Sequence, residues 1–208
     1  MKLFYSTGTC SLAAHIVARE AGIILEIEKV DIFKTPHVTA GGRNFNLINS
    51  KGYVPALMLD DGSLLTEGAA IVQYLADLNP DARLAPPAGT LDRYQLQSWL
   101  NFIAAELHKM YSPWLFHAEY GAAIQQIARE KIAGRLALVE SHLAEQGPFL
   151  MGAQFTAADA YLYVIVGWSN FAKVDLMAFP ALRDFMNRVG ARPMVREAIA
   201  AERVKPAA

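Results

Sequence analysis

The chain has 208 residues, 53% of them hydrophobic, so it can bury a substantial core as one large domain or two small ones. This composition excludes an intrinsically disordered protein. The 19 basic and 20 acidic residues give a formal net charge of -1 without any block of like charge, which argues against binding to nucleic acid or to an anionic membrane.

Membrane spans, disulfides and metal centres are also not expected. The longest uninterrupted apolar stretch, residues 160–168, is too short to span a bilayer, and polar residues interrupt the apolar start of the chain, so it does not resemble a secretory signal. Cys10 is the only cysteine, which rules out an internal disulfide, and the five histidines show no short metal-ligand spacing. We expect a cytoplasmic protein without a metal ion.

The N-terminal region mixes strand and helix patterns. A short strand is expected at Lys2–Tyr5, then a loop of turn-forming residues, then a helix over residues 11–21 that ends at Gly22. Residues 23–31 alternate loosely as a second strand. This β-α-β order is typical of the opening of a thioredoxin-like domain, and it places Cys10 at the N-terminus of a helix.

Residues 34–49 are expected to form a mobile loop with one poor helix, because the glycine pair Gly41-Gly42 argues against regular structure there. A hairpin that leads into a helix follows this loop. Its strands are expected at residues 56–59 and Leu64–Thr66, and the intervening turn contains Gly62. The apolar spacing then becomes helical, until Asn79 and Pro80 stop the helix.

Two features of this hairpin and helix suit a small peptide-like ligand. A cis bond between Val54 and Pro55 would leave the main-chain N–H and C=O of Val54 able to pair with an extended peptide. Glu67 and Gly68 lie at the helix N-terminus, where main-chain N–H groups and the helix dipole favour a carboxylate. Together they predict a site for a small zwitterionic peptide, although each alone also fits a strand edge or a helix cap.

The rest of the chain is predicted to be helical. Residues 81–89 contain Pro86 and Pro87 and few periodic positions, which indicates a linker. Thr156 and Asp159 form a capping-box pattern in front of an apolar helix. Helices are expected over residues 91–111, 122–145, 157–171, 181–190 and 193–202.

These motifs resemble those of the glutathione transferases over nearly the whole chain. The Val54-Pro55-Ala56-Leu57 run, the hairpin and Glu67-Gly68 resemble the glutathione-binding half of the family, and Cys10-Ser11 paired with Glu106-Leu107-His108-Lys109 resembles its bacterial beta class. The implied architecture is an α/β thioredoxin-like N-terminal domain, a linker and an all-α helical C-terminal domain, over residues 1–80, 81–89 and 90–208.

Cys10, Ser11 and His108 are the predicted catalytic residues. At a helix N-terminus the pKa of the Cys10 thiol should fall, which favours a mixed disulfide; alternatively its N–H and the Ser11 hydroxyl would hold the thiolate of bound glutathione. Simpler roles are an inert buried cysteine and a serine N-cap. A lone helical histidine is usually structural, but in the family this histidine faces the thiol and polarises it or relays a proton.

The motifs and the resemblance together give a set of residues expected to bind glutathione. Some contacts from its helical members are expected to cross the interface of a homodimer. Lys34 would hold the glycine end, although Thr35 and Pro36 follow it in a loop slightly longer than the family pattern. The set is Cys10, Lys34, Val54, Pro55, Glu67, Gly68, Asn101, Ala105, Glu106, His108 and Lys109.

The sequence leaves two possible roles for five aromatic side chains of the helical region. They either line a pocket for a second substrate or belong to the core, which is the commoner outcome for aromatic residues at helical spacing. They are Tyr111, Trp114, Phe116, Tyr163 and Trp168.

The resulting hypothesis is a glutathione transferase with a role in detoxification, which conjugates the glutathione thiol to electrophilic, largely apolar small molecules. It would need no cofactor beyond the co-substrate glutathione. One alternative is a glutathione-dependent thiol reductase in which Cys10 passes through a mixed disulfide. Another is a non-catalytic ligand-binding member of the fold, although ligand carriage needs none of the three predicted catalytic residues.

Overall fold

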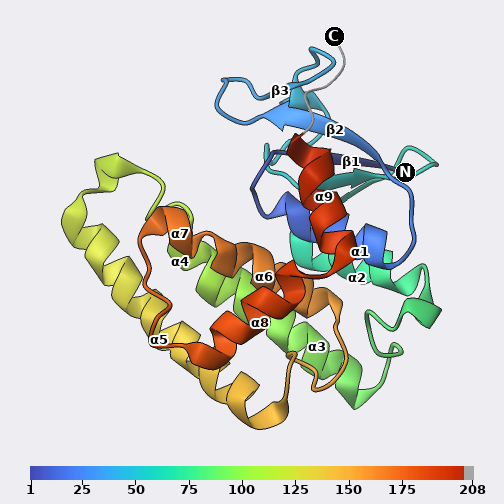
Figure 1. The fold of residues 1–208 in the computed structure, drawn as a ribbon. Helices are drawn as coiled ribbons and strands as arrows, with labels where there is room; N and C mark the ends of the chain where they lie inside the picture. The colour runs from blue at the N-terminus through green and yellow to red at the C-terminus, as the bar shows by residue number, and fades with distance from the viewer. Residues whose placement is uncertain (204–208) are drawn as a thin grey trace. The chain divides into compact units, whose positions relative to one another are not determined.

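The computed structural model describes residues 1–203, which form two compact units. The first unit combines Met1–Leu84 with the C-terminal segment that contains the last helix, α9 (Pro193–Arg203); the second is Ala85–Ala191 (Figure 1). The predicted helical domain, residues 90–208, included this last helix. In the structure α9 packs against α1 (Ser11–Glu20), so the first unit contains both the first strand and the last helix.

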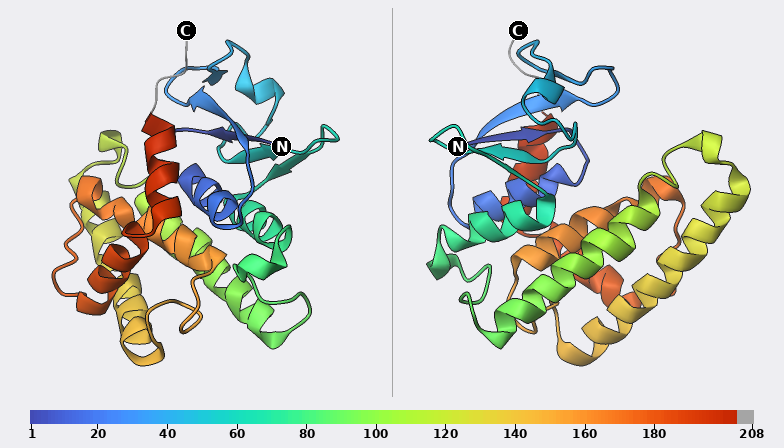
Figure 2. Two further views of the ribbon diagram at one scale, coloured as in Figure 1. Left: turned by 45° about the vertical axis from the view of Figure 1, so that its right-hand side comes forward. Right: turned by 180° about the vertical axis from the view of Figure 1, so that it is seen from behind.

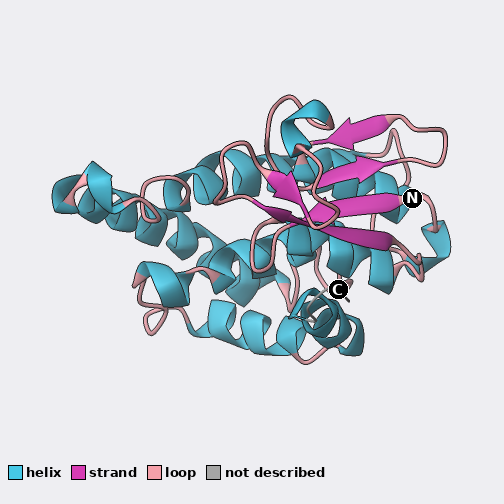
Figure 3. Cartoon of the chain, turned by 90° about the horizontal axis from the view of Figure 1, so that it is seen from above, coloured by secondary structure: helices cyan, strands magenta, loops and turns pink. Residues whose placement is uncertain are grey.

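The first unit is built on a five-stranded sheet in the order β3-β2-β1-β4-β5 (Figure 3). β1 runs parallel to β2, and the other neighbouring pairs are antiparallel. Phe4 of β1 lies opposite Ala56 of β4, and Ala56 lies opposite Thr66 of β5. The strands are β1 (Lys2–Tyr5), β2 (Glu26–Asp31), β3 (Val38–Thr39), β4 (Ala56–Met58) and β5 (Leu64–Thr66).

Two helices, α1 and α2 (Gly68–Asp77), lie side by side on one face of this sheet (Figure 2). Their apolar positions recur at helical spacing and are buried against apolar residues of the strands, which is why these segments form amphipathic helices. The buried side chains include Leu3, Leu57, Ile16, Val17, Ile71, Val72 and Leu75.

The segment over residues 34–49 has more regular structure than expected. It contains the short strand β3 and a 3-10 turn, η1 (Phe45–Leu47), whose Phe45 is buried against Phe4 with ring centroids 5.5 Å apart. Gly42, with a φ of 78°, provides the left-handed turn beside β3. The glycine pair therefore forms a turn rather than an irregular loop. A second 3-10 turn, η2 (Pro80–Ala82), lies at the boundary between the predicted domain, which ends at residue 80, and the predicted linker.

The second unit is helical. Its central helix is almost wholly apolar and buried, and it packs against neighbours on several sides, including α3 and α8. The elements are α3 (Leu91–Phe102), η3 (Ile103–His108), α4 (Lys109–Tyr111), η4 (Ala118–Tyr120), α5 (Ala122–Gln146), the central α6 (Ala157–Gly167), α7 (Ser169–Ala172) and α8 (Pro180–Gly190).

Two predicted helices are divided in the structure. The segment expected to be one helix over residues 91–111 contains a π-helical turn, η3, and the segment over 157–171 divides at Trp168 between α6 and α7. The capping box of α6 is confirmed. The Asp159 N–H donates a hydrogen bond to the Thr156 side chain, and the Thr156 N–H donates one to the Asp159 carboxylate. Within residues 1–203, no helix combines the length and apolar character needed to cross a membrane.

Candidate functional site

The predicted site residues divide between the two units. The sheet-containing unit carries Cys10, Ser11, Lys34, Val54, Pro55, Glu67 and Gly68, and the helical unit carries Asn101, Ala105, Glu106, His108 and Lys109.

Three segments of the first unit meet at one end of its sheet. The strand register places the loop after β1, the residues before β4 and the residues after β5 at the same edge, so Cys10, Val54 and Glu67 come from neighbouring positions. The Cys10 thiol donates a hydrogen bond to the Val54 carbonyl, with Sγ 3.3 Å from the oxygen. The Val54–Pro55 bond is cis. The predicted nucleophile therefore lies beside the main chain predicted to pair with a peptide ligand.

The Val54 carbonyl was expected to be available to a ligand, but it accepts a hydrogen bond from within the protein. A carbonyl oxygen has two lone pairs, so it can accept from the thiol and from a ligand N–H together. Cys10 itself is partly exposed and forms the N-cap of α1. This position is the one expected for a reactive cysteine at a helix N-terminus.

Ser11 is placed differently from its predicted role. Its side chain is fully buried, and its hydroxyl lies 3.2 Å from the Ser6 carbonyl and 2.8 Å from the Thr9 hydroxyl, while the Ser6 N–H donates to it at 3.2 Å. These bonds hold the loop that precedes Cys10. The N-cap of α1 is Cys10 rather than Ser11, so we assign the serine to loop structure and not to catalysis.

Charges of both signs gather where α2 begins. Glu67 is its N-cap and has a φ of 72°, a left-handed conformation that is uncommon for a residue with a side chain. The Lys51 ammonium lies 2.6 Å from the Glu67 carboxylate and 3.1 Å from the Thr66 hydroxyl. A zwitterionic peptide could therefore find both a carboxylate and an ammonium here, next to the N–H groups that begin the helix at Gly68.

The lysine beside Glu67 is Lys51, which is not among the residues predicted from the sequence. Lys34 is largely exposed and lies 3.5 Å from Asp31 at the end of β2. No local pattern singles out Lys51, because its partner is 16 residues away and is brought close only by the corner between β5 and α2.

The predicted residues of the helical unit lie on or beside the π-helical turn. Asn101, Ala105, Glu106 and Lys109 are exposed. Glu106 forms an ion pair with Arg135 of α5 at 2.8 Å. A π-helical turn is less favourable than an α-helical one and occurs frequently at functional sites, because the extra residue changes the direction of the side chains that follow.

His108, the last residue of η3, is partly buried in an aromatic environment. Its Nδ1 lies 2.8 Å from the Tyr161 hydroxyl, and its ring meets the Trp168 ring at 69° with centroids 5.0 Å apart. Burial, and to a smaller extent the positive charge of Lys109, together lower the pKa of His108 from 6.5 to about 4. The imidazole is therefore neutral at physiological pH.

The aromatic residues around Trp168 belong to the core of the helical unit more than to an open pocket. Trp168 and Tyr111 are buried, and the Tyr111 hydroxyl lies 2.6 Å from that of Ser169. Burial raises the pKa of Tyr111 to about 12, so this phenol keeps its proton. Phe116 contacts Trp168 at 5.2 Å and is 44% exposed, so it forms the outer edge of the cluster around His108.

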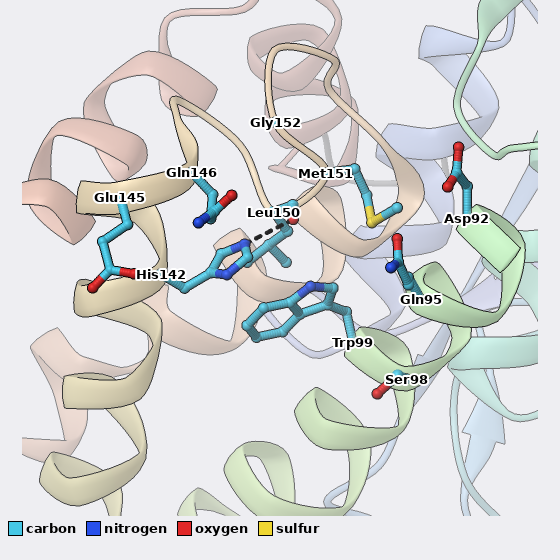
Figure 4. A pocket seen from close by; sticks show the side chains of 10 residues that line it. All are labelled: Asp92, Gln95, Ser98, Trp99, His142, Glu145, Gln146, Leu150, Met151 and Gly152. Carbon is cyan, nitrogen blue, oxygen red and sulfur yellow. Dashed lines mark hydrogen bonds between the residues drawn. The ribbon is translucent and has the colours of Figure 1, made fainter.

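A separate pocket of about 630 Å³ lies between α3 and α5 and is closed on one side by the loop at residues 150–152 (Figure 4). Trp99 and His142 form its floor with ring centroids 4.6 Å apart, and His142 Nε2 donates to the Leu150 carbonyl at 2.9 Å. It is lined by none of the residues predicted to bind glutathione. Across residues 1–203, no three His, Cys, Asp or Glu side chains are grouped so that they could hold a metal ion.

Known proteins resemble this chain in sequence and in fold. Residues 7–78 match the model of the glutathione S-transferase N-terminal domain, and residues 121–188 match that of its C-terminal domain. Glutathione S-transferase GstA of Escherichia coli O157:H7 is 42% identical over 99% of this chain and 100% of its own length.

Two solved structures are similar to this chain in both sequence and fold. A sphingomonad glutathione S-transferase complexed with glutathione is 42% identical, with a TM-score of 0.93 over 99% of this chain and 100% of its own. The bacterial beta class glutathione S-transferase of Sphingomonas chungbukensis is 40% identical, with a TM-score of 0.92 and the same coverage.

Proposed function

The chain belongs to the glutathione S-transferase family, and we propose that it conjugates the thiol of glutathione to electrophilic, largely apolar small molecules. The observation that carries this proposal is the meeting of Cys10, the Val54 main chain and the start of α2 at one end of the sheet. The similar sphingomonad enzyme was solved with glutathione, which supports glutathione as co-substrate.

Glutathione has an ammonium group and two carboxylates, and the first unit offers a partner for each. The Glu67 carboxylate suits the ammonium, and the N–H groups at the start of α2 suit the neighbouring carboxylate. Lys51 adds a positive charge beside Glu67, and Lys34 remains the proposed partner of the glycine end. The main chain at Val54 and Pro55 would align the cysteinyl residue with Cys10.

The helical residues would complete the glutathione site. We propose this role for Asn101, Ala105, Glu106, His108 and Lys109, some of them across the interface of a homodimer, as the family resemblance implies. A cytoplasmic location and a part in detoxification belong to the same proposal.

In the proposed reaction the glutathione sulfur reacts as a thiolate. Binding brings it next to the electrophile, and N–H groups at the start of α1, the Cys10 thiol and His108 stabilise its negative charge. The sulfur forms a bond to the electrophilic carbon, and the leaving group departs with the electron pair of the broken bond.

A thiol reductase is the second candidate, because Cys10 is partly exposed at a helix N-terminus. The Cys10 thiolate would attack a substrate disulfide that contains glutathione, form a mixed disulfide and release the other sulfur as a thiolate. A second glutathione thiolate would then release Cys10 and leave as oxidised glutathione.

The first experiment compares wild type, Cys10→Ala and Cys10→Ser in two assays, glutathione-dependent consumption of an aryl halide and reduction of a glutathione mixed disulfide. We expect both variants to retain conjugation within about tenfold, because other donors also stabilise the thiolate. We expect both to lose disulfide reduction, because neither has a sulfur.

Other results would change the proposal. Loss of conjugation in Cys10→Ala but not in Cys10→Ser would make the side-chain donor at this position essential to the transfer. If the wild type neither turns over the aryl halide nor binds glutathione in calorimetry, the non-catalytic alternative is favoured instead.

A further inference from the structure

The pocket between α3 and α5 has no part in the proposed function. All of its lining residues belong to the helical unit, so its form does not depend on the first unit. Its volume of about 630 Å³ is within the range of small-molecule sites, roughly 300 to 1,000 Å³. More than half of the lining side chains are polar or charged, so the pocket suits a polar ligand better than a purely apolar one.

The Trp99 and His142 rings at the floor of this pocket are held in place by protein contacts. The Phe102 ring meets the Trp99 ring edge-on, at 89° with centroids 5.7 Å apart. His142 lies against Trp99 at 4.6 Å, and its Nε2 is bonded to the Leu150 carbonyl. The indole is only half-buried, so part of its aromatic surface can contact a ligand. Such a surface favours a cation.

The pocket carries acidic groups without a basic residue to balance them. Asp92, in the first turn of α3, and Glu145, in the last turn of α5, are its two acidic residues, and no lysine or arginine lines it. Both residues are exposed, and within residues 1–203 neither forms an ion pair. The resulting field attracts positive charge.

Helix stability explains the position of Asp92 but not that of Glu145. A carboxylate is favourable at the positive N-terminal end of a helix and unfavourable at its negative C-terminal end. Glu145 lies one residue before the end of α5, where the last main-chain carbonyl groups add partial negative charge. A second negative group here costs the helix some stability, but it strengthens the attraction for a cation.

Figure 4 shows Asp92 and Glu145 at opposite ends of the lining, with the Trp99 and His142 rings between them. A ligand that pairs with both carboxylates therefore needs a cationic group at each end. The segment that joins the two groups would lie on the aromatic floor, so an apolar chain suits it. Ammonium groups fit the ends, because they donate charge-assisted hydrogen bonds to carboxylates.

We propose that this pocket is a second binding site, which takes an organic dication made of two ammonium groups joined by an alkyl chain. One ammonium pairs with Asp92, the other pairs with Glu145, and the chain covers the exposed part of Trp99. The inference does not rest on the proposed function, since none of the residues predicted to bind glutathione lines the pocket.

Calorimetry with three kinds of ligand tests the charge requirement. The probes are hexamethylenediamine and octamethylenediamine, the singly charged hexylamine and octylamine, and the neutral hexanediol and octanediol. We expect the tighter diamine to bind about fivefold more strongly than the monoamine of the same length, because the second ion pair forms within a complex held by the first. The diols should bind more weakly than either amine. Equal affinities of diamine and monoamine, or no binding of either diamine, would overturn the proposal.

The indole N–H signals of the three tryptophans locate the bound ligand. In ¹H–¹⁵N spectra, the Trp99→Phe variant identifies the Trp99 signal. The tighter diamine should shift this signal and leave those of Trp114 and Trp168, which lie outside the pocket. A shift confined to Trp114 or Trp168 would place the ligand elsewhere and would also overturn the proposal.

Two amide variants test the carboxylates themselves. Asp92→Asn and Glu145→Gln should each weaken diamine binding about fivefold, to the level of the monoamine. Glu130→Gln is the matched control, because Glu130 is an exposed glutamate of α5 outside the pocket. Unchanged affinity in Asp92→Asn and Glu145→Gln, or an equal loss in Glu130→Gln, would contradict the proposed pairing. Glutathione conjugation should be the same in all three variants, so the two proposals are tested separately.

Discussion

At the scale of single residues, the Glu67–Lys51 pair is the clearest addition that the structure makes to the predicted site. The two charged atoms are 2.6 Å apart, and both side chains are more than half exposed, so the pair itself adds little to stability. The pair would matter for ligand binding instead. Exposed charged groups at the start of a helix can separate from each other and bind a ligand without the loss of a buried contact.

This leads to a prediction about two lysines. If Lys51 meets a glutathione carboxylate, Lys51→Met should raise KM for glutathione by about tenfold and leave kcat within about twofold, the pattern of a lost binding contact. Lys34→Met, assayed in parallel, reports on the glycine end. Steady-state kinetics at saturating electrophile measure both. An unchanged KM in Lys51→Met would leave this lysine as a partner of Glu67 alone.

The lowered pKa of His108 also makes stability depend on pH. The folded protein binds a proton at His108 only near pH 4, whereas the unfolded chain binds one near pH 6.5. The stability associated with this group is therefore fully present above pH 6.5 and is lost as the pH falls toward 4. We expect the wild type to lose about 2 to 3 kcal/mol from this group between pH 7.5 and 4.5.

The comparison is with His108→Gln, which has no titratable group at this position. Urea unfolding of both proteins at pH 7.5 and pH 4.5 gives four free energies of unfolding. Between these two pH values, the free energy of unfolding should fall less in His108→Gln than in the wild type, by about 2 to 3 kcal/mol. The same fall in both proteins would mean that His108 is not held neutral in the folded state.

At the scale of elements, the start of α6 depends on one buried carboxylate. Asp159 accepts hydrogen bonds from the Leu150 N–H at 2.8 Å and from the Thr156 N–H and hydroxyl, each at 2.7 Å. These bonds favour the charged form, but burial outweighs them and raises the pKa of Asp159 to about 6. The carboxylate therefore joins the loop before α6 to the first turn of the helix that occupies the centre of the unit.

We predict that Asp159→Ala lowers the free energy of unfolding by about 2 to 4 kcal/mol, because it leaves buried donors without their acceptor. Asp184→Ala, which removes an exposed carboxylate from α8, should change it by less than about 0.5 kcal/mol. Urea unfolding at pH 7 measures both. A loss below about 1 kcal/mol in Asp159→Ala would show that water replaces the lost acceptor.

At the scale of the whole molecule, α9 and Arg192, the residue before it, contact the rest of the first unit through charged groups as well as through the packing of α9 on α1. Arg192 pairs with Glu20 through two bonds of 2.7 Å, and Glu202, only 2% exposed, lies 3.4 Å from His15 of α1. The Glu202 carbonyl also accepts from the Thr7 hydroxyl at 3.0 Å. Thr7 belongs to the loop that carries Cys10, so the last helix supports the predicted site.

We therefore expect Glu202→Ala to destabilise the protein by about 2 to 4 kcal/mol, since it removes the buried partner of His15. Glu197→Ala is the control on the same helix, because its ion pair with Arg19 is exposed and should contribute less than about 1 kcal/mol. Thermal unfolding of both variants tests this. Similar melting temperatures for the two would indicate that the buried contact contributes no more than the exposed one.

Much of the fold could be predicted because its signals are local. The strand at Lys2–Tyr5, the hairpin, α1 and the capping box depend on alternation, turn residues and side chains three or four positions apart. The features that were missed depend on distant segments. Strand β3 is two residues long and exists through its pairing with β2, and α9 has a helical pattern that does not say which unit it joins.

The candidate site divides in the same way. Cys10 and Glu67 could be selected because helix termini are visible in a sequence, and His108 because its motif resembles that of a family. Tyr161 could not, since it lies 53 residues from His108 and nothing near it in the chain marks it as different from a core tyrosine. The burial of Ser11 depends on the path of the loop at Ser6, which no local pattern specifies.

The position of α9 has a consequence for synthesis. The ribosome releases the strands, α1 and α2 first, yet the surface of α1 that α9 covers stays exposed until residues 193–203 have emerged. The nascent N-terminal unit must therefore wait for the whole helical unit to be translated before its packing is complete. During that interval it presents apolar surface to which a chaperone could bind.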